Sequence, residues 1–402
     1  MIDRIYGAML QGHLRHFPVV AVVGARQTGK TTLLRSLLPA FTYVTLDLPS
    51  EAALAEEDPQ QFFLRHPAPV IIDEVQYAPG LFRHLKALVD QDRHKMGQFL
   101  LTGSQKFTLM KEMSDSLAGR VCLVGLEGLS WGELVPSGVN LSRYIARGGF
   151  PELWRLPDLP SSSWFSSYVA TYLERDVRQI LNVGDLRDFE RFIRVLATRH
   201  GQQLDLTAVG NAVGVTGRTA KAWLSVLEAS NQILLLEPWY GNVGKRIVKT
   251  PKVYFADSGL VCWLLGISPE TLLSSPFLGA LWEGVVYAEL RRICQARNLN
   301  RSFYFYRDNG GTEVDFLILG EGARLVECKW KTLPNSDDLR GLHKLATLAA
   351  DSGNFELVGS RLALVCQTET VFPLEGATIC GLGDLVSSIL NPVLVSRGGS
   401  PP

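Results

Sequence analysis

The sequence predicts an α/β protein of several domains: a parallel sheet, then a helical segment, a helix-turn-helix unit and a second α/β unit. Three observations lead to this fold class. Apolar runs alternate with helical stretches over residues 1–140, which is typical of a parallel sheet covered on both faces. The pattern turns helical over 161–200. The 402 residues are also too many for a single hydrophobic core.

Composition narrows the class of protein further. With 46% hydrophobic and 20% charged residues, the chain has the mix of a globular protein. Lys plus Arg equal Asp plus Glu at 40 each, so contact with DNA would have to come from local basic patches. The six cysteines form no C-x-x-C pair, which argues against a zinc site or a disulfide framework. No signal peptide or membrane-length apolar run occurs, so we expect a cytoplasmic protein.

The elements are expected in the following order. Strands are predicted within 17–23, 41–47, 69–74, 98–103 and 121–126. The expected domains are an α/β core (1–140), a helical lid or linker (141–203), a winged helix-turn-helix (204–265), a second α/β domain (266–390) and a disordered tail (391–402).

The strongest motif is a P-loop, G-x-x-x-x-G-K-[ST], between the first strand and a helix. Its glycines let backbone N–H groups wrap phosphates, and the helix N-terminus adds partial positive charge. Lys30 is expected to reach the β- and γ-phosphates of ATP, and Thr31 to bind Mg²⁺. The expected nucleotide-binding set is Gly24, Ala25, Arg26, Gln27, Thr28, Gly29, Lys30, Thr31, Thr32 and Ser104.

A pair of adjacent carboxylates, Asp73 and Glu74, ends the predicted buried strand Val70–Glu74. Asp73 is expected to hold Mg²⁺ through water, and Glu74 to polarise the attacking water as a general base. The alternative is an ordinary strand terminus, which the P-loop upstream makes less favourable.

One further strand, at 41–47, separates these two motifs in the sequence, as in AAA-type ATPases. The next strand ends in Thr102 and Ser104, either of which can sense the γ-phosphate, and Ser104 is favoured. Arg120 lies just before the fifth strand, where AAA proteins often carry an arginine that enters a neighbouring subunit's site. The alternative for Arg120 is a surface or helix-capping role.

Residues 205–258 fit a winged helix-turn-helix. Arg218 and Lys221 share one face of its second helix, and the loop and strand that follow add Lys245, Arg246, Lys249 and Lys252. These residues can grip DNA phosphates with the helix in the major groove. The alternative is a unit that serves only for packing or assembly.

The C-terminal unit places acidic residues on a hairpin that turns at residues 320–323. Alternation puts Glu313 and Asp315 on one face of the first strand, and the register pairs Asp315 with Glu327 and Glu313 with Lys329. Glu283 can reach in from the preceding helix. This is the layout of PD-(D/E)XK nucleases, in which acids hold Mg²⁺ and the lysine steadies the attacking hydroxide. Facing carboxylates need a cation to join them; the alternative is a solvated face with one Glu313–Lys329 ion pair.

Over nearly its whole length the chain resembles a family of bacterial and archaeal AAA-type ATP-binding proteins with a C-terminal domain of unknown function. The motifs that carry this are GARQTGKTTLL, VIIDEVQ, FLLTGSQ, SLAGRV, GGFPE, YLERDV, KVYFADSGL and EVDF…ECKW. The resemblance implies an AAA fold, a winged helix and a restriction-endonuclease-like end domain. It supports Lys30, Thr31, Asp73 and Glu74 in the ATP site, and Glu283, Asp315, Glu327 and Lys329 in the second site. Cys328 stands where the family commonly has an aliphatic residue or alanine.

Two functions follow as hypotheses. The first is an ATP-hydrolysing ring- or dimer-forming homo-oligomer that remodels DNA or cuts it with Mg²⁺, including branched or foreign DNA. The second is a nucleotide-dependent signalling or scaffolding switch whose C-terminal domain makes only protein contacts, which the balanced charge favours. A kinase is a third and weaker hypothesis, because the extra strand at 41–47 is typical of AAA-type ATPases and not of the simplest P-loop kinases.

Overall fold

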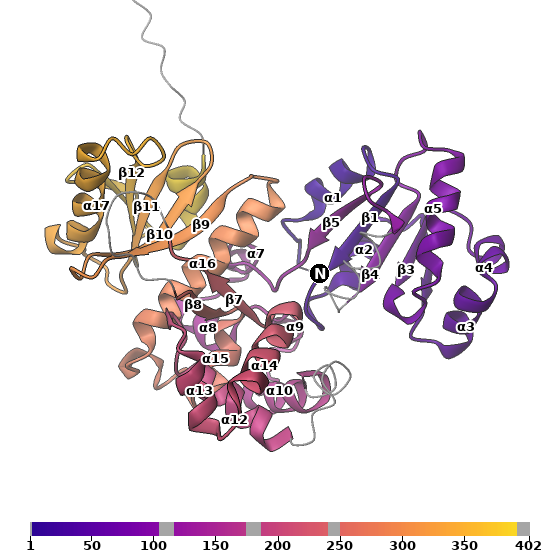
Figure 1. Ribbon diagram of the computed structural model, residues 1–402, viewed down its shortest axis with the longest axis horizontal. Coiled ribbons are helices and arrows are strands. Elements are labelled where there is room, and N and C mark those ends of the chain that lie inside the picture. Colours follow the sequence, from indigo (N-terminus) through magenta and orange to yellow (C-terminus); the bar gives the residue numbers. More distant parts are fainter. Residues whose placement is uncertain (1, 104–115, 174–185, 240–249, 392–402) are drawn as a thin grey trace, which may run out of the picture.

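The computed structural model describes residues 2–103, 116–173, 186–239 and 250–391. Figure 1 shows an α/β part at the N-terminus, a helical part in the middle of the chain and a second α/β part at the C-terminus. The long helix α16 lies between the last two sheets and runs toward the first part.

Within the described residues, five parallel strands form the N-terminal sheet. In spatial order they are β2 (Thr42–Thr45), β3 (Val70–Asp73), β4 (Phe99–Gly103), β1 (Val19–Val23) and β5 (Val121–Gly125). Each lies inside a run that the sequence predicts as a strand. The strand inserted between β1 and β3 in space is β4, whereas β2, which separates them in the sequence, lies at the sheet edge. The C-terminal ends of β1, β3 and β4 are therefore neighbours.

Helices cover both faces of this sheet. Along β1, Val19, Ala21 and Val23 pack in one apolar cluster, and Val20 and Val22 in another. This alternation follows from the two-residue period of a strand. The helices are α1 (Gly7–Leu14), α2 (Lys30–Leu37), α3 (Pro49–Glu57), α4 (Pro59–Arg65), the 3₁₀ turn η1 (Val75–Tyr77) and α5 (Leu81–Gln91).

Short helices dominate the middle of the chain. They are α7 (Trp131–Leu134), η2 (Val135–Ser137), α8 (Leu141–Arg147), α9 (Pro151–Arg155), α10 (Ser161–Tyr168), the π-helical turn η3 (Val169–Leu173) and α12 (Leu186–Ala197). The sequence predicts the helical character of 161–200 but not the helices between 131 and 155. Most of the predicted YLERDV motif (172–177) lies outside the described residues.

The helices and strands expected for a winged helix occur in the expected order. They are β6 (Gln202–Gln203), α13 (Leu206–Val213), α14 (Gly217–Ala229), β7 (Ile233–Leu236), β8 (Lys252–Phe255) and α15 (Ser258–Leu264). Asp205 and Thr216 cap the two helices, and Gly214 between them has a φ of 86°, as a tight turn requires. The three strands pair antiparallel in the order β6-β8-β7 within the described ranges.

The C-terminal part carries a mixed sheet, six-stranded in the residues that the structure describes, with the order β13-β14-β12-β11-β10-β9. Phe316 pairs with Val326 and Leu317 with Leu325, so the predicted hairpin register is confirmed. The elements are η4 (Leu272–Ser274), α16 (Leu278–Ala296), β9 (Ser302–Arg307), β10 (Glu313–Leu319), β11 (Arg324–Cys328), η5 (Ser336–Leu339), α17 (Arg340–Asp351), β12 (Arg361–Val365), β13 (Phe372–Leu374), β14 (Ala377–Cys380), η6 (Leu382–Asp384) and η7 (Val386–Leu390).

One apolar cluster joins the last three parts of the chain. It extends from Leu129 in the segment after β5 to Leu390 in η7 and includes Trp282 of α16. The helical part, the helix–strand unit from β6 to α15, and the C-terminal sheet are therefore packed around α16. Among the helices in the described ranges, none combines the length and apolar character needed to cross a bilayer.

Candidate nucleotide site and acidic cluster

The P-loop wraps back on itself between β1 and α2. Gln27 and Gly29 have φ values of 65° and 86°, which turn the backbone of the loop inward. The Lys30 ammonium is buried and donates to the carbonyl oxygens of Gly24 (3.0 Å) and Ala25 (2.9 Å). The Lys30 ammonium thus lies against the P-loop, which is the segment expected to bind the phosphates.

Close backbone packing explains why a glycine stands at position 24. A Cβ at this position would lie 2.1 Å from the backbone oxygen of Leu126, so only glycine allows the loop to pass so close to the end of β5.

Asp73 at the end of β3 is the centre of a hydrogen-bonded group. Its Oδ2 accepts from the hydroxyls of Thr31 (2.8 Å) and Tyr43 (2.8 Å), and its Oδ1 accepts from Thr102. Burial and the hydrogen bond to Asp73 raise the pKa of Tyr43 to about 12, so its phenol stays a donor. The Thr31–Asp73 contact brings together the two residues predicted to hold Mg²⁺, and their donor set fits that ion.

Glu74 follows Asp73 with a φ of 57°, in the left-handed region. Its N–H donates to Thr102 Oγ1 (3.1 Å), so Thr102 contacts both acidic residues. Ser104, the favoured γ-phosphate sensor, lies outside the described residues. The alternative sensor, Thr102, lies near the C-terminal end of β4. The proximity of Thr102 to Asp73 depends on β4 lying beside β3 in space, which the order in the sequence does not reveal.

A cavity of about 1040 Å³ opens beside the P-loop. The predicted residues that line it are Arg26, Gln27, Gly29, Lys30, Thr31, Thr32 and Glu74. Ala25 and Thr28 line a separate cavity of about 30 Å³ instead. Two segments that the sequence did not assign to this site also line the cavity: one contributes Ile2, Asp3 and Arg4, and the other contributes Pro151, Glu152, Trp154 and Arg155. Only the motif GGFPE pointed toward that second segment.

Arg4 supports the P-loop from outside. Its guanidinium donates to the backbone oxygens of Thr28 (2.9 Å) and Glu127 (2.7 Å) and pairs with the Glu133 carboxylate (3.0 Å). No sequence motif marks this arginine.

Arg120 lies at the other end of the sheet. Its carbonyl oxygen accepts from Val19 N–H, at the start of β1, whereas the P-loop follows the end of β1. Its guanidinium makes two hydrogen bonds to the Asp90 carboxylate, at 2.7 and 3.0 Å. Arg120 is therefore not part of its own chain's nucleotide site.

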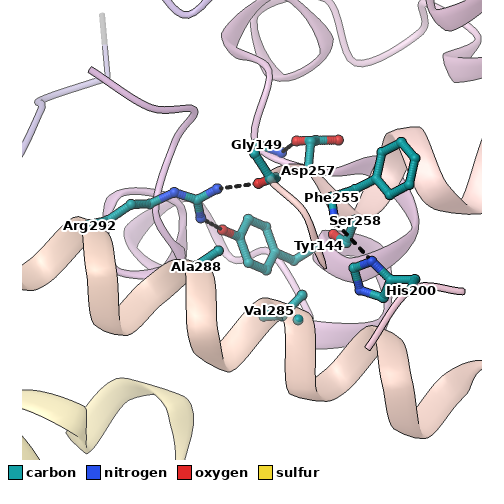
Figure 2. Close-up of a pocket in the computed structure, with 11 residues that line it drawn as sticks. Tyr144, Gly149, His200, Phe255, Asp257, Ser258, Val285, Ala288 and Arg292 are labelled. Carbon is teal, nitrogen blue, oxygen red and sulfur yellow. Dashed lines mark hydrogen bonds between the residues drawn. The ribbon is translucent and has the colours of Figure 1, made fainter. Parts of the chain in front are cut away.

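A small buried cavity of about 10 Å³ lies between α8, β8 and α16 (Figure 2). Asp257 accepts from the backbone N–H groups of Gly149 (2.7 Å) and Leu260 (2.9 Å), and a Cβ on Gly148 would lie 2.2 Å from its carboxylate. The motifs GGFPE and KVYFADSGL thus interlock here. Arg292 donates to Tyr144 (2.9 Å) in the same group. The cavity is too small for a ligand, so these contacts are structural.

The C-terminal acidic residues do converge, but with a different lysine at the centre. Nζ of Lys252 lies 2.9 Å from Glu283, 2.8 Å from Glu313 and 3.9 Å from Asp315. The prediction that Lys252 grips DNA phosphates is therefore wrong, because this side chain is buried among carboxylates. Of the other basic residues, Arg218 and Lys221 are exposed on α14, and Lys245, Arg246 and Lys249 lie outside the described ranges.

Lys329 pairs with Glu327 (2.6 Å). The alternative Glu313–Lys329 ion pair does not occur, since Glu313 pairs with Lys252 and Arg307. Burial and the neighbouring carboxylates raise the pKa of Asp315, whose Oδ2 accepts from the Cys328 N–H (2.8 Å). Across the part of the chain that the structure describes, no group of three or more His, Cys, Asp or Glu side chains is arranged to hold a metal ion.

Comparison with known proteins gives three matching family models. An AAA domain matches residues 16–135, and two domains of unknown function, DUF8612 and DUF4143, match 139–271 and 278–385. The uncharacterized protein Rv2008c of Mycobacterium tuberculosis is 32% identical over 384 residues, which cover 94% of this chain and 83% of that protein. The uncharacterized protein Mb2031c of Mycobacterium bovis matches to the same extent.

Among solved structures, a Walker-type ATPase of Pyrococcus abyssi is 16% identical with a TM-score of 0.45 and covers 66% of this chain and 96% of its own. The RuvB Holliday junction branch migration motor of Thermotoga maritima is 15% identical with a TM-score of 0.27, covering 57% of this chain and 85% of its own. The chain is an AAA-type P-loop ATPase in which the AAA domain precedes DUF8612 and DUF4143, and it belongs to the same family as Rv2008c.

Proposed function

We propose that this protein binds ATP with Mg²⁺ in the cavity over the P-loop and hydrolyses it. The observation that carries the proposal is the hydrogen bond between Thr31 and Asp73, beside a cavity that Lys30, Thr31 and Glu74 line together. When bound, Mg²⁺ neutralises charge on the β- and γ-phosphates. Thr31 and Asp73 are the residues that would hold it.

Each side chain then has a distinct task. Lys30 leaves the Gly24 and Ala25 carbonyls and donates to phosphate oxygens. Glu74 accepts a proton from, or orients, the attacking water, and its backbone is fixed by Thr102. Arg4 keeps the loop in place through the Thr28 carbonyl.

The test separates binding from hydrolysis. Glu74→Gln should retain ATP with near wild-type affinity and lose hydrolysis by about 100-fold or more. Lys30→Ala should lose both. Equal hydrolysis by wild type and Glu74→Gln would contradict the assignment of the base.

Arg120 is proposed as the residue that completes a neighbouring chain's site. Its distance from its own P-loop supports this role, and its pairing with Asp90 holds it at the molecular surface. The expected assembly is a homo-oligomer, a dimer or a ring.

Mixing two inactive variants tests this directly. Arg120→Ala and Glu74→Gln should each be inactive alone, and an equimolar mixture should recover part of the activity because one interface then holds both intact residues. A mixture as inactive as its components, with both variants still oligomeric, would rule out the trans role.

Action on DNA is proposed through α14. Arg218 and Lys221 lie exposed one turn apart on the helix that Thr216 caps, as a phosphate-contacting helix requires. The double variant Arg218→Ala/Lys221→Ala should weaken binding to linear and branched duplexes at low salt and reduce the salt dependence. Lys86→Ala, on the exposed side of α5, is the control. Unchanged affinity would favour the switch hypothesis, in which the C-terminal part makes only protein contacts.

A further inference from the structure

The helix–strand unit and the C-terminal sheet are joined by backbone hydrogen bonds. Phe305 N–H of β9 donates to the Glu237 oxygen (3.1 Å), and Trp239 N–H donates to the Phe305 oxygen (2.8 Å). The Trp239 side chain is buried in the C-terminal apolar cluster and donates to Glu356 (3.2 Å). The chain just after β7 thus extends along β9, which brings β8 close to the acidic residues.

Two side chains of β8 point into the acidic group. Lys252 and Tyr254 are two residues apart and share a face of their strand. Both contact Oε1 of Glu283 on α16. The Lys252 ammonium also lies 5.4 Å from the centre of the Phe305 ring, within cation–π range. Its side chain is only 3% exposed.

The carboxylates are spaced around an ammonium group. The nearest oxygens of Glu283 and Glu313 lie 2.9 and 2.8 Å from Lys252 Nζ, the usual length of a charge-assisted hydrogen bond. Mg²⁺ would need oxygens at about 2.1 Å in an octahedral set. Asp315, at 3.9 Å, completes the ring of acids around this nitrogen. The acids implied by the nuclease resemblance therefore do not fit a divalent ion while Lys252 is in place.

Charge balance supports the same conclusion. Four carboxylates gather here, from Glu283, Glu313, Asp315 and Glu327. Three basic groups face them: Lys252 at the centre, Lys329 on Glu327 (2.6 Å) and Arg307 on Glu313 (3.4 Å). A dication added to this group would first have to displace a buried ammonium. Glu327 Oε2 is the one buried oxygen of these acids without a hydrogen-bond partner within the described residues, so a dication bound there would take most of its ligands from water.

We propose that Lys252 is the resident cation of this cluster and takes the place of a divalent metal ion, so that the cluster joins β8 to the C-terminal domain instead of forming a nuclease centre. Among the described residues, loss of the lysine charge leaves Glu283 and Asp315 without a neighbouring cation that pairs with them directly, and leaves Glu313 with Arg307 alone. Such a cluster should bind a dication that the wild-type cluster does not.

The experiment measures Mn²⁺ bound to the full chain by electron paramagnetic resonance without nucleotide. Asp73→Asn is present in every sample to remove the metal site next to the P-loop. With Lys252 present, no bound Mn²⁺ attributable to the cluster is expected at millimolar concentration. Lys252→Met should gain one bound Mn²⁺ with at least tenfold higher affinity, and Mn²⁺ should raise its melting temperature. Lys331→Met, which removes the Lys331–Asp338 pair (2.5 Å) just after β11 without removing a cation that pairs with the cluster, is the control and should gain nothing.

Mn²⁺ bound to the chain that retains Lys252, and lost on Asp315→Asn, would overturn the proposal. If Lys252→Met does not fold, the pair Lys252→Met/Glu283→Gln removes one charge of each sign and keeps the question open to measurement. This double variant should melt above Lys252→Met, because it leaves one less uncompensated carboxylate. An equally low melting temperature for both would also count against the lysine as a charge-balancing group.

Discussion

At the scale of single residues, the nucleotide site depends on Thr102 as much as on the motif residues. Its hydroxyl donates to Asp73 and accepts from the Glu74 backbone, so it fixes the two acidic residues relative to each other. The sequence offers Thr102 only as the alternative to Ser104 for sensing the γ-phosphate, and not as a link between Asp73 and Glu74.

Thr102→Val tests this role. The substitution keeps the shape but leaves the Glu74 N–H without its acceptor, which costs about 1–3 kcal/mol of stability. We expect ATP hydrolysis to fall by about 10-fold or more while ATP affinity changes little. Tyr43→Phe is the control, since it removes one donor to Asp73 without touching Glu74. If Thr102→Val hydrolyses ATP at the wild-type rate, Thr102 does not position the base.

His200 makes the free energy of unfolding depend on pH. Burial lowers the pKa of His200 from 6.5 to about 4, and its Nδ1 accepts from the Phe255 N–H (3.1 Å). Between these two pH values the unfolded chain binds a proton at this residue that the folded chain does not. Stability therefore falls as pH drops through this window.

The difference between wild type and His200→Asn isolates this effect, because the asparagine oxygen can accept the same hydrogen bond. Wild type should lose about 2 kcal/mol more than the variant between pH 7.5 and pH 5, measured by urea unfolding. Parallel pH profiles would show that folding does not lower the pKa of His200.

Residue motifs were predictable where the chemistry is local in the sequence. Lys30 and Thr31 follow from one continuous loop, and Asp73 from the end of one apolar run. Lys252 was misassigned because its neighbours in the sequence are basic, whereas its neighbours in space, Glu283 and Glu313, are 31 and 61 positions away. Position along the chain cannot show that β8 packs against another domain's acids.

Among helices and strands, those with a strong periodic pattern of apolar residues were predicted correctly from the sequence. The five strands of the first sheet and the hairpin register follow from apolar runs and alternation. The short helices α7 and α9 were missed because four or five residues carry too little periodicity; a capping box between Ser130 and Glu133 and tertiary packing stabilise α7.

Helix α16 offers a test at this scale. Gly284 faces the buried His200 ring, and a Cβ there would lie 2.2 Å from its Nε2, whereas Gly279 in the same helix has no atom within 4 Å. Gly284→Ala should destabilise the protein by about 1–3 kcal/mol despite the better helix propensity of alanine. Gly279→Ala should stabilise it by up to about 1 kcal/mol. Chemical unfolding of both variants checks the contrast, and equal effects would contradict this packing of α16.

At the scale of the whole molecule, α16 connects the two charged sites. Glu283 near one end contacts Lys252, and Arg291 and Arg292 near the other end face Glu127 of the P-loop domain at 3.3 and 3.6 Å. Figure 1 shows this helix running between the C-terminal sheet and the first α/β part. We therefore expect ATP binding to change the stability of α16.

Hydrogen exchange measures this coupling. ATP should slow amide exchange in α16 of the wild type, and Glu127→Ala should remove much of that protection because its two arginine contacts are lost. Glu321→Ala, which removes an exposed carboxylate from the buried Arg301 (3.1 Å), is the control and should behave as wild type. Identical protection in all three proteins would argue against transmission through Glu127.

In the proposed function, the P-loop, Thr31 and Asp73 together hold ATP with Mg²⁺. The most direct measurement is equilibrium binding of a slowly hydrolysed ATP analogue to wild type, Lys30→Ala and Asp73→Asn, each with Mg²⁺ and with EDTA. Wild type should bind tightly and lose affinity in EDTA, Lys30→Ala should bind weakly throughout, and Asp73→Asn should lose most of the Mg²⁺ dependence. No binding by folded wild type, or equal binding by all three proteins, would contradict the account.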